Sequence, residues 1–514
     1  MKDSVVRVFA GCRIYTLNPK CAIAEAIAVH NGKVLAVGSA DEVRYAVGHD
    51  AEWTDMEGLT IVPGLIDSHN HLVHYGISAT HYADLSGCRS VGELLKRLHH
   101  FREANPTSAW IIGERFDHEL LAEGRWPTRR DLDKVSPEVP IVIVRLCLHA
   151  LVANSAALEP VKGQLSHEQL ETGLLTEDAM ELIWSQIPEP SRRELESAAL
   201  WAAREARRVG LTGVHVMLND REEFEAFCNL RDYDRLPIRV YAVCPADMLD
   251  YLRKRGLRTG SGDEWLRIGG LKLFADGAMG ARTAAMRQPF ADCPDEKGVL
   301  FRNERDIAIA LEEMQTYGFQ ACIHAIGDLA IECALEGIRQ AQDTGNRGNI
   351  LRHRIEHASQ MDDDLIEKMR RLNVIASVQP QFVVTDFWTY DRVGPERYRW
   401  SYPFKTMLDA GIMLAMGSDC PVERLSPIEL VDRAVNREPR SLQERLTVEE
   451  TLRAYTWGSA FAGFSDNQGG SIEPGKWADF TVLSDDVFAL PSSQLASVRV
   501  EGTIVGGFLE LDCC

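Results

Sequence analysis

The stretch IVPGLIDSHNH (61–71) joins a short apolar segment to two histidines that stand two residues apart. The apolar part, IVPGLID (61–67), predicts a buried strand. Alternate residues of an extended chain point to the same side, so His69 and His71 project together and suit two imidazole ligands of one metal ion. The chain contains 15 histidines, however, so this motif alone is weak evidence for a metal site.

Downstream of this stretch, apolar strand candidates alternate with longer helical segments. The helical candidates include 192–210 and 304–318, and the second has apolar residues at helical spacing and a glycine at its end. Eight strands separated by helices predict an α/β fold, a closed (β/α)8 barrel of the TIM type, over residues 61–460. The strand candidates that follow 61–67 are 212–217, 238–243, 268–274, 319–324, 353–357, 374–378 and 412–417.

The two ends of the chain have a different pattern, with short strands and turn residues. Asn31-Gly32 between two apolar runs predicts a tight hairpin, and the segments 476–486 and 498–511 also read as strands. Because chain termini often lie close together, residues 1–60 and 461–514 are expected to form one small composite β-sandwich domain.

The barrel region is longer than a plain barrel requires. A simple (β/α)8 barrel needs about 250 residues, and most of the excess here lies between about 80 and 200. We therefore expect an inserted lobe after the first strand, where it would cover the substrate.

Ionisable side chains stand near the ends of several predicted strands. Taken singly, the lysine could form a salt bridge, a histidine could be a core residue, and the aspartate could cap a helix. Together they point to a shared metal centre, since buried charge is costly without partners. Nitrogen and oxygen donors of this kind suit zinc, and one or two divalent ions are expected. The expected ligands are His69, His71, Lys272, His324, His357 and Asp419.

An ammonium group cannot bind a cation. Lys272 must therefore be deprotonated, or carboxylated by carbon dioxide so that two oxygens could bridge two metal ions.

Three further residues are candidates for contacts with substrate. His149 could donate a hydrogen bond to a substrate oxygen or cap a loop. Asp276 could orient Lys272 or a metal ligand, and Arg282 could hold an anionic group or brace its loop, with the brace favoured slightly.

An aromatic segment, 380–392, follows the seventh strand candidate. Its residues Phe382, Phe387 and Trp388 could line an apolar pocket or pack against the insertion.

Composition excludes several classes of protein. The formal net charge is −20, which argues against a nucleic-acid partner. No apolar run is long enough to span a membrane. Twelve cysteines without a CxxC pair suggest reduced thiols and a cytoplasmic location. We also expect a homo-oligomer, a dimer.

Several motifs resemble those of the amidohydrolase superfamily, and more closely its YtcJ-like subgroup, which includes the N-substituted formamide deformylases. The resemblance covers nearly the whole chain in the same order, and 131–158 resembles an insertion of that subgroup. The motifs are VPGLIDSHNHL (62–72), LKLFADGAMGARTAAM (271–286), HAIGD (324–328), RIEHA (354–358), GSDCPVE (417–423) and GSIEPGKWADFTVL (470–483).

The resemblance implies a barrel, a terminal β-sandwich and a metal centre with a bridging hydroxide. By motif position, His69 and His71 would bind the more buried metal ion, and carboxylated Lys272 would bridge to a second ion. The second ion would be bound by His324 and His357, while Asp419 would be both ligand and general base.

The function expected from these observations is metal-dependent hydrolysis of an amide-type or formamide-type C–N bond in a small molecule. The same centre could instead open a cyclic amide or lactone, cleave a phosphoester or deaminate a ring, and the six ligands do not distinguish these reactions. A non-catalytic metal-binding or regulatory barrel is the less favoured alternative.

Overall fold

The computed structural model describes residues 5–48, 50–106, 108–146, 150–345, 348–437 and 439–511. The chain divides into two compact units, which are described separately. One unit contains the chain up to Leu72 and from Leu200 onward, and the other contains Val73–Ala199. Within the described part of the chain, no helix is both long and apolar enough to cross a membrane.

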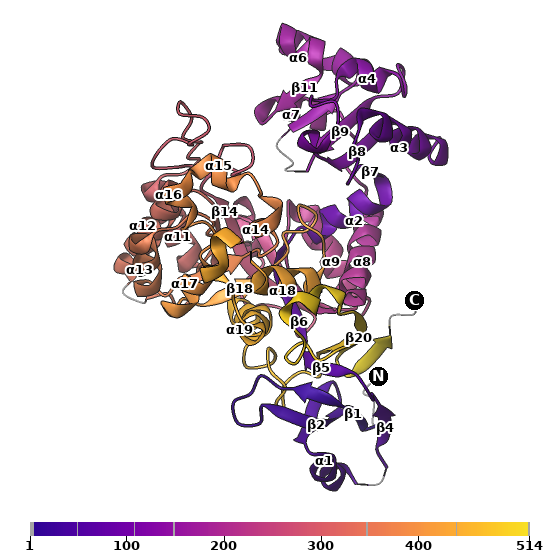
Figure 1. Ribbon diagram of the computed structural model, residues 1–514, viewed down its shortest axis with the longest axis vertical. Helices are drawn as coiled ribbons and strands as arrows, with labels where there is room; N and C mark the ends of the chain where they lie inside the picture. The colour runs from indigo at the N-terminus through magenta and orange to yellow at the C-terminus, as the bar shows by residue number, and fades with distance from the viewer. Residues whose placement is uncertain are drawn as a thin grey trace. The chain divides into compact units, whose positions relative to one another are not determined.

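The larger unit contains an eight-stranded parallel barrel that is nearly closed (Figure 1). The order β18-β17-β16-β15-β14-β13-β12-β6 follows the sequence, so each strand lies beside the next one in the chain. This confirms the predicted fold class. The strands are β6 (Leu65–Asn70), β12 (Leu211–Met217), β13 (Arg239–Pro245), β14 (Leu266–Phe274), β15 (Ala321–Ala325), β16 (Arg354–His357), β17 (Ile375–Val378) and β18 (Leu414–Met416).

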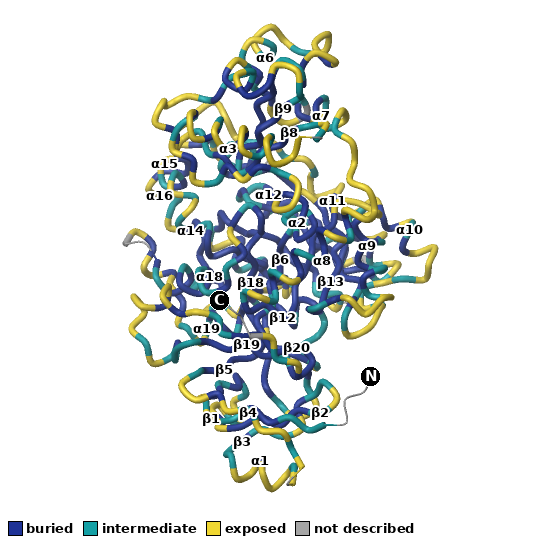
Figure 2. Tube along the Cα trace, turned by 90° about the vertical axis from the view of Figure 1, so that its right-hand side faces the viewer, coloured by how far each residue is buried: buried dark blue, intermediate teal, exposed yellow. Residues whose placement is uncertain are grey.

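Helices connect these strands, as a barrel with parallel strands requires. In α13 (Asp363–Arg371) the Asp362 side chain accepts a hydrogen bond from the Leu365 amide and caps the helix, while Leu365, Ile366 and Met369 are buried. Figure 2 shows the barrel strands buried and the outward parts of the connections exposed. Other connecting helices are α8 (Arg192–Arg208), α9 (Arg221–Asp232), α10 (Leu249–Lys254), α11 (Glu304–Thr316), α12 (Asp328–Gly345), α17 (Phe404–Asp409), α18 (Pro427–Val435) and α19 (Val448–Arg453).

Both ends of the chain contribute to a second eight-stranded sheet, in the order β21-β20-β19-β5-β1-β2-β3 with β4 beside β1. The predicted hairpin at Asn31-Gly32 is present, and both residues have positive φ, 50° and 74°. The strands are β1 (Arg7–Tyr15), β2 (Ile23–His30), β3 (Lys33–Gly38), β4 (Glu52–Asp55), β5 (Thr60–Pro63), β19 (Phe480–Leu483), β20 (Val500–Val505) and β21 (Phe508–Leu511), with α1 (Ala40–Val47) after β3.

The segment IVPGLID (61–67) is not one strand, as its apolar run predicts, but parts of two. Strand β5 ends at Pro63 in the terminal sheet, and β6 begins the barrel at Leu65. Proline has no amide hydrogen for a ladder, which favours a strand end here. A Cβ added at Gly64 would clash with the Thr212 side chain, so glycine allows the close passage between the two sheets.

The smaller unit has its own five-stranded sheet, in the order β11-β10-β9-β8-β7. Buried apolar residues such as Leu98, Ile143 and Leu151 fill its two hydrophobic clusters. Its strands are β7 (Ala83–Asp84), β8 (Ile111–Phe116), β9 (Ile141–Arg145), β10 (Ala150–Ala153) and β11 (Leu174–Thr176). Its helices include α2 (Leu72–His81), α3 (Val91–Ala104), α4 (Arg129–Asp133), α5 (Ser155–Leu158), α6 (His167–Thr172) and α7 (Asp178–Trp184).

The gap between the first and last barrel strands is bridged just beyond the end of β18. The Asp419 amide donates to the His69 carbonyl and the His71 amide donates to the Cys420 carbonyl, both at 2.7 Å. The buried Asp67 carboxylate also accepts hydrogen bonds from the amides of His69, at 3.0 Å, and Ser418, at 3.1 Å. We call this set of contacts, between residues 67–71 and 418–420, the barrel seam.

Close approach at the barrel seam requires a residue without a side chain at position 417. A Cβ added at Gly417 would clash with the His69 amide nitrogen and the Asp67 carboxylate. Both neighbours are held by the hydrogen bonds of the seam, so neither can move aside without breaking one of these contacts.

Gly417→Ala is therefore expected to lower the free energy of unfolding by about 1–3 kcal/mol, as overpacking of a rigid core does. Urea unfolding followed by circular dichroism measures the effect. Gly213→Ala is the matched control, since an added Cβ in β12 would meet its neighbours only at 3.6 Å or beyond. Equal stability of the two variants would contradict this account of the seam.

Candidate metal centre

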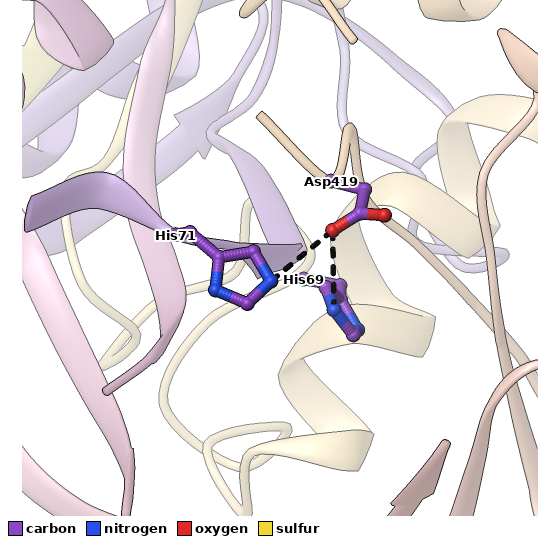
Figure 3. Close-up of side chains that lie close together, drawn as sticks. All are labelled: His69, His71 and Asp419. Carbon is purple, nitrogen blue, oxygen red and sulfur yellow. Dashed lines mark ion pairs between the residues drawn. The ribbon is translucent and has the colours of Figure 1, made fainter. Parts of the chain in front are cut away.

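Three of the predicted ligands converge at the barrel seam (Figure 3). The Nε2 atoms of His69 and His71 each lie 3.4 Å from Asp419 Oδ1, and the three candidate ligand atoms all lie within 4.8 Å of one another. His69 and Asp419 are buried, while His71 is partly exposed. The i, i+2 spacing of the histidines thus brings both rings to one carboxylate, as the strand geometry predicts.

The remaining predicted ligands adjoin this group. Lys272 Nζ lies 3.5 Å from His69 Nε2. The ring centroid of His357 lies 4.9 Å from that of His69 and 4.5 Å from that of His324. All six predicted ligands therefore belong to one continuous group of neighbours, although they come from β6, β14, β15, β16 and the segment after β18.

The donor atoms fit a divalent cation such as zinc. A tetrahedral site with bonds of about 2.0–2.1 Å separates its ligand atoms by about 3.4 Å, and the two His–Asp419 separations are 3.4 Å. Asp419 Oδ1 is also buried without a hydrogen-bond partner. Such an atom is costly unless something else compensates its charge, and a shared cation would do so.

Burial favours the neutral forms of three side chains in this group, His69, His357 and Lys272. Burial lowers the pKa of His69 and His357 well below the usual range, and the positive charge of Lys272 lowers both further. A neutral imidazole is the form that offers a lone pair to a metal. Burial also lowers the pKa of Lys272, although the nearby Glu356 and Asp419 oppose this.

The backbone turns sharply where two of these side chains leave their strands. His357 has φ of 74° and Asp419 has φ of 59°, both in the left-handed region that non-glycine residues rarely adopt. Strain of this kind collects at functional sites, where the surrounding structure holds it in place. Glu356 faces His69 inside the barrel. In a regular strand the next residue, His357, would point to the opposite side, away from His69. The positive φ of His357 interrupts this alternation, so both side chains can face the same group.

Two hydrogen-bond partners of the histidines were missed from the sequence. Glu356 Oε2 lies 2.6 Å from His69 Nδ1, and Gln379 Oε1 lies 2.8 Å from His357 Nδ1. The signal for Glu356 was present in RIEH (354–357), since alternation places residues 354 and 356 on the same side of a strand. Nothing in the local pattern around Gln379 points to its partner.

Asp276 mainly anchors loops. Its carboxylate accepts hydrogen bonds from the amides of Ala285 at 2.9 Å, Ile326 at 3.0 Å and Gly327 at 2.8 Å. His324 Nε2 lies 3.6 Å from the same carboxylate. Asp276 therefore joins the loop after β14 to the one after β15 and lies beside one predicted ligand.

Arg282 forms an ion pair with Asp292 at 2.6 Å. His149 lies outside the described residues.

The aromatic residues after β17 are expected either to line a pocket or to pack against the insertion, and they differ in their surroundings. The Phe382 ring centroid lies 6.4 Å from that of His357, so this side chain is near the candidate metal centre. Trp388 packs beneath the Arg392 guanidinium at 3.8 Å and joins a hydrophobic cluster. Phe387 is 56% exposed and lines no described core.

The chain is similar in sequence to proteins of a known family. The sequence model of the Amidohydrolase family matches residues 52–508. "Putative amidohydrolase YtcJ" of Bacillus subtilis is 30% identical, with 97% of this chain and 98% of that protein covered. "N-substituted formamide deformylase" of Arthrobacter pascens is 28% identical, with 100% and 99% covered.

A solved structure agrees with the sequence matches. The crystal structure of an uncharacterized metal-dependent hydrolase from Pyrococcus furiosus superposes with a TM-score of 0.80 at 31% identity, over 94% of this chain and 100% of that one. The match to the family extends over most of the chain, and it includes every predicted ligand. The chain therefore belongs to the amidohydrolase family and is a metal-dependent hydrolase.

Proposed function

We propose that the chain hydrolyses a C–N bond of the amide or formamide type in a small organic substrate. One or two divalent metal ions, zinc in the first place, would be held by the six residues His69, His71, Lys272, His324, His357 and Asp419. The observation that carries the proposal is the buried Asp419 Oδ1, which has no hydrogen-bond partner and lies 3.4 Å from two histidine nitrogens. The 28% identical relative named as a formamide deformylase supports this choice of bond.

The six side chains would divide between two positions. His69 and His71 would hold one ion, and His324 and His357 the other. At the first metal position, Glu356 contacts Nδ1 of His69, so Nε2 would bind the cation. At the second metal position, Gln379 contacts Nδ1 of His357 in the same way.

A bound divalent ion of this kind lowers the pKa of water to about 7 and polarises a carbonyl oxygen. Asp419 would act as general base and then general acid, since its carboxylate lies among the ligands. It would accept the proton of the attacking water and deliver that proton to the departing nitrogen. The C–N bond breaks, the carbonyl carbon keeps the hydroxyl oxygen, and an amine leaves.

Carboxylated Lys272 would complete the centre. Burial lowers the pKa of this amine, which favours the neutral form, whose nitrogen lone pair attacks carbon dioxide. The new N–C bond would form with loss of a proton from the nitrogen, and the two carbamate oxygens would then offer ligand atoms for two cations.

We also propose a cellular location and an oligomeric state for the protein. All nine cysteines within the described residues are free thiols, which supports a cytoplasmic location. A homodimer is proposed on the size and charge of the chain.

Removal of one ligand should abolish turnover without unfolding the protein. Elemental analysis of the wild-type protein should find about one to two divalent metal ions per chain. Asp419→Asn should lower kcat by at least about 100-fold, because it removes the general base, and His71→Ala should lower the bound metal. Activity is measured on N-formyl amines, N-acyl amino acids, cyclic imides and lactones, so that the panel also identifies the bond.

Asp250→Asn and His167→Ala are the matched controls, since both side chains are exposed and lie outside the group of ligands. Metal-free wild-type protein that stays inactive on every amide after zinc loading would overturn the proposal.

Carboxylation of Lys272 has a direct spectroscopic signature. Protein prepared in ¹³C-bicarbonate should show a carbamate carbon resonance that is absent in Lys272→Arg, because a guanidinium does not form a carbamate. Lys254→Arg, at an exposed position, should keep the resonance. If the resonance is missing from zinc-loaded wild-type protein, Lys272 is not carboxylated.

A further inference from the structure

A chain of charged and polar side chains runs from His69 into the interior of the barrel. Glu356 is fully buried, and its Oε2 lies within hydrogen-bond distance of a histidine, whereas its Oε1 makes an ion pair. One oxygen, Oε2, lies 2.6 Å from His69 Nδ1, and the other, Oε1, lies 2.6 Å from Arg354 Nε. The carboxylate therefore joins a candidate metal ligand to a buried guanidinium.

Arg354, in β16, is itself fully buried and contacts two other barrel strands. Its Nη1 lies 2.8 Å from His215 Nδ1 in β12, and its Nη2 donates to the Ser68 carbonyl in β6 at 3.2 Å. An arginine side chain only donates hydrogen bonds, so the His215 Nδ1 must accept. The ring of His215 and the Ser68 carbonyl thus hold Arg354 in place, and neither of them is a second anion.

We propose that Glu356 is a positioning residue for His69 and that Arg354, through its 2.6 Å contact with Glu356, holds that carboxyl group on the side of the ring opposite to the metal. Glu356 Oε2 lies 2.6 Å from His69 Nδ1 and would accept a hydrogen bond from that nitrogen, which fixes the orientation of the ring. The lone pair of Nε2 then points toward His71 and Asp419.

This inference rests on the proposed function for the cation that Nε2 would bind. It goes beyond the six predicted ligands, because neither Glu356 nor Arg354 would touch that cation. It also explains why β16 carries two fully buried charged residues, where apolar side chains would pack at lower cost.

The first test measures zinc affinity by competition with a chromogenic chelator. Partners of this kind typically change metal affinity by 10–100-fold, so Glu356→Gln should weaken zinc binding by about that factor. Glu444→Gln is the matched control, because Glu444 is also buried in the same unit and accepts hydrogen bonds from Thr406. It should leave zinc affinity unchanged. Equal zinc affinity in the two variants would overturn the inference.

Loss of Glu356 alone leaves Arg354 as an unpaired buried charge, which could unfold the protein. The double variant Arg354→Met with Glu356→Leu removes both charges and should fold, since no orphan charge remains. Its zinc affinity should fall as far as that of Glu356→Gln. A folded double variant with wild-type affinity would contradict a positioning role.

The second test needs no metal. The Nδ1 proton of His69, in a short hydrogen bond to a buried carboxylate, should give a downfield, slowly exchanging resonance in the proton spectrum of metal-free protein. It should disappear in His69→Gln and in Glu356→Gln and persist in Glu444→Gln. Persistence in Glu356→Gln would overturn the inference. If wild-type protein shows the resonance but binds no zinc, the proposed function fails while the assignment of the His69 ring stands.

Discussion

The hydrogen bonds of the barrel seam are the constraint on which the candidate metal centre depends. Residues 69–71 and 418–420 are more than 300 positions apart in the sequence, yet their backbones are joined at 2.7 Å in two places. Each of these contacts would cost about 1–3 kcal/mol to break in a buried setting. His69, His71 and Asp419 are therefore held together by the main chain before any ion binds, and the cation meets a site that is already assembled.

The interior of the barrel is unusually polar for a region that is buried, and its polarity serves the same purpose. Asp67 holds two backbone amides of the seam, Glu356 holds His69, and Gln379 holds His357. These contacts restrict the rotation of the candidate ligands, which is how a protein prepares a site for a cation without reorganisation at the moment of binding. The positive φ of His357 and Asp419 belongs to the same arrangement, since seam and strand contacts hold both residues in conformations that they would otherwise avoid.

Much of the fold follows from local patterns in the sequence, and the parts that do not have identifiable physical causes. Most barrel strands were predictable because they are short apolar runs, and the grouping of the six candidate ligands was predictable because they stand near the ends of such runs. The division of 61–67 between two sheets was missed, since apolar residues alone do not reveal a change of partner at Gly64. The roles of Arg354 and Gln379 depend on residues that are distant in sequence, and no local pattern encodes such partners. The left-handed turn at His357 also lies outside any period-two prediction.

Anomalous X-ray diffraction from crystals of zinc-loaded protein, recorded above and below the zinc edge, tests the central claim most directly. The account predicts an anomalous peak within bonding distance of His69 Nε2, His71 Nε2 and Asp419, with Glu356 on the far side of the His69 ring and out of contact with the ion. A peak elsewhere in the molecule, or none at the seam in crystals whose zinc content has been verified, would contradict it.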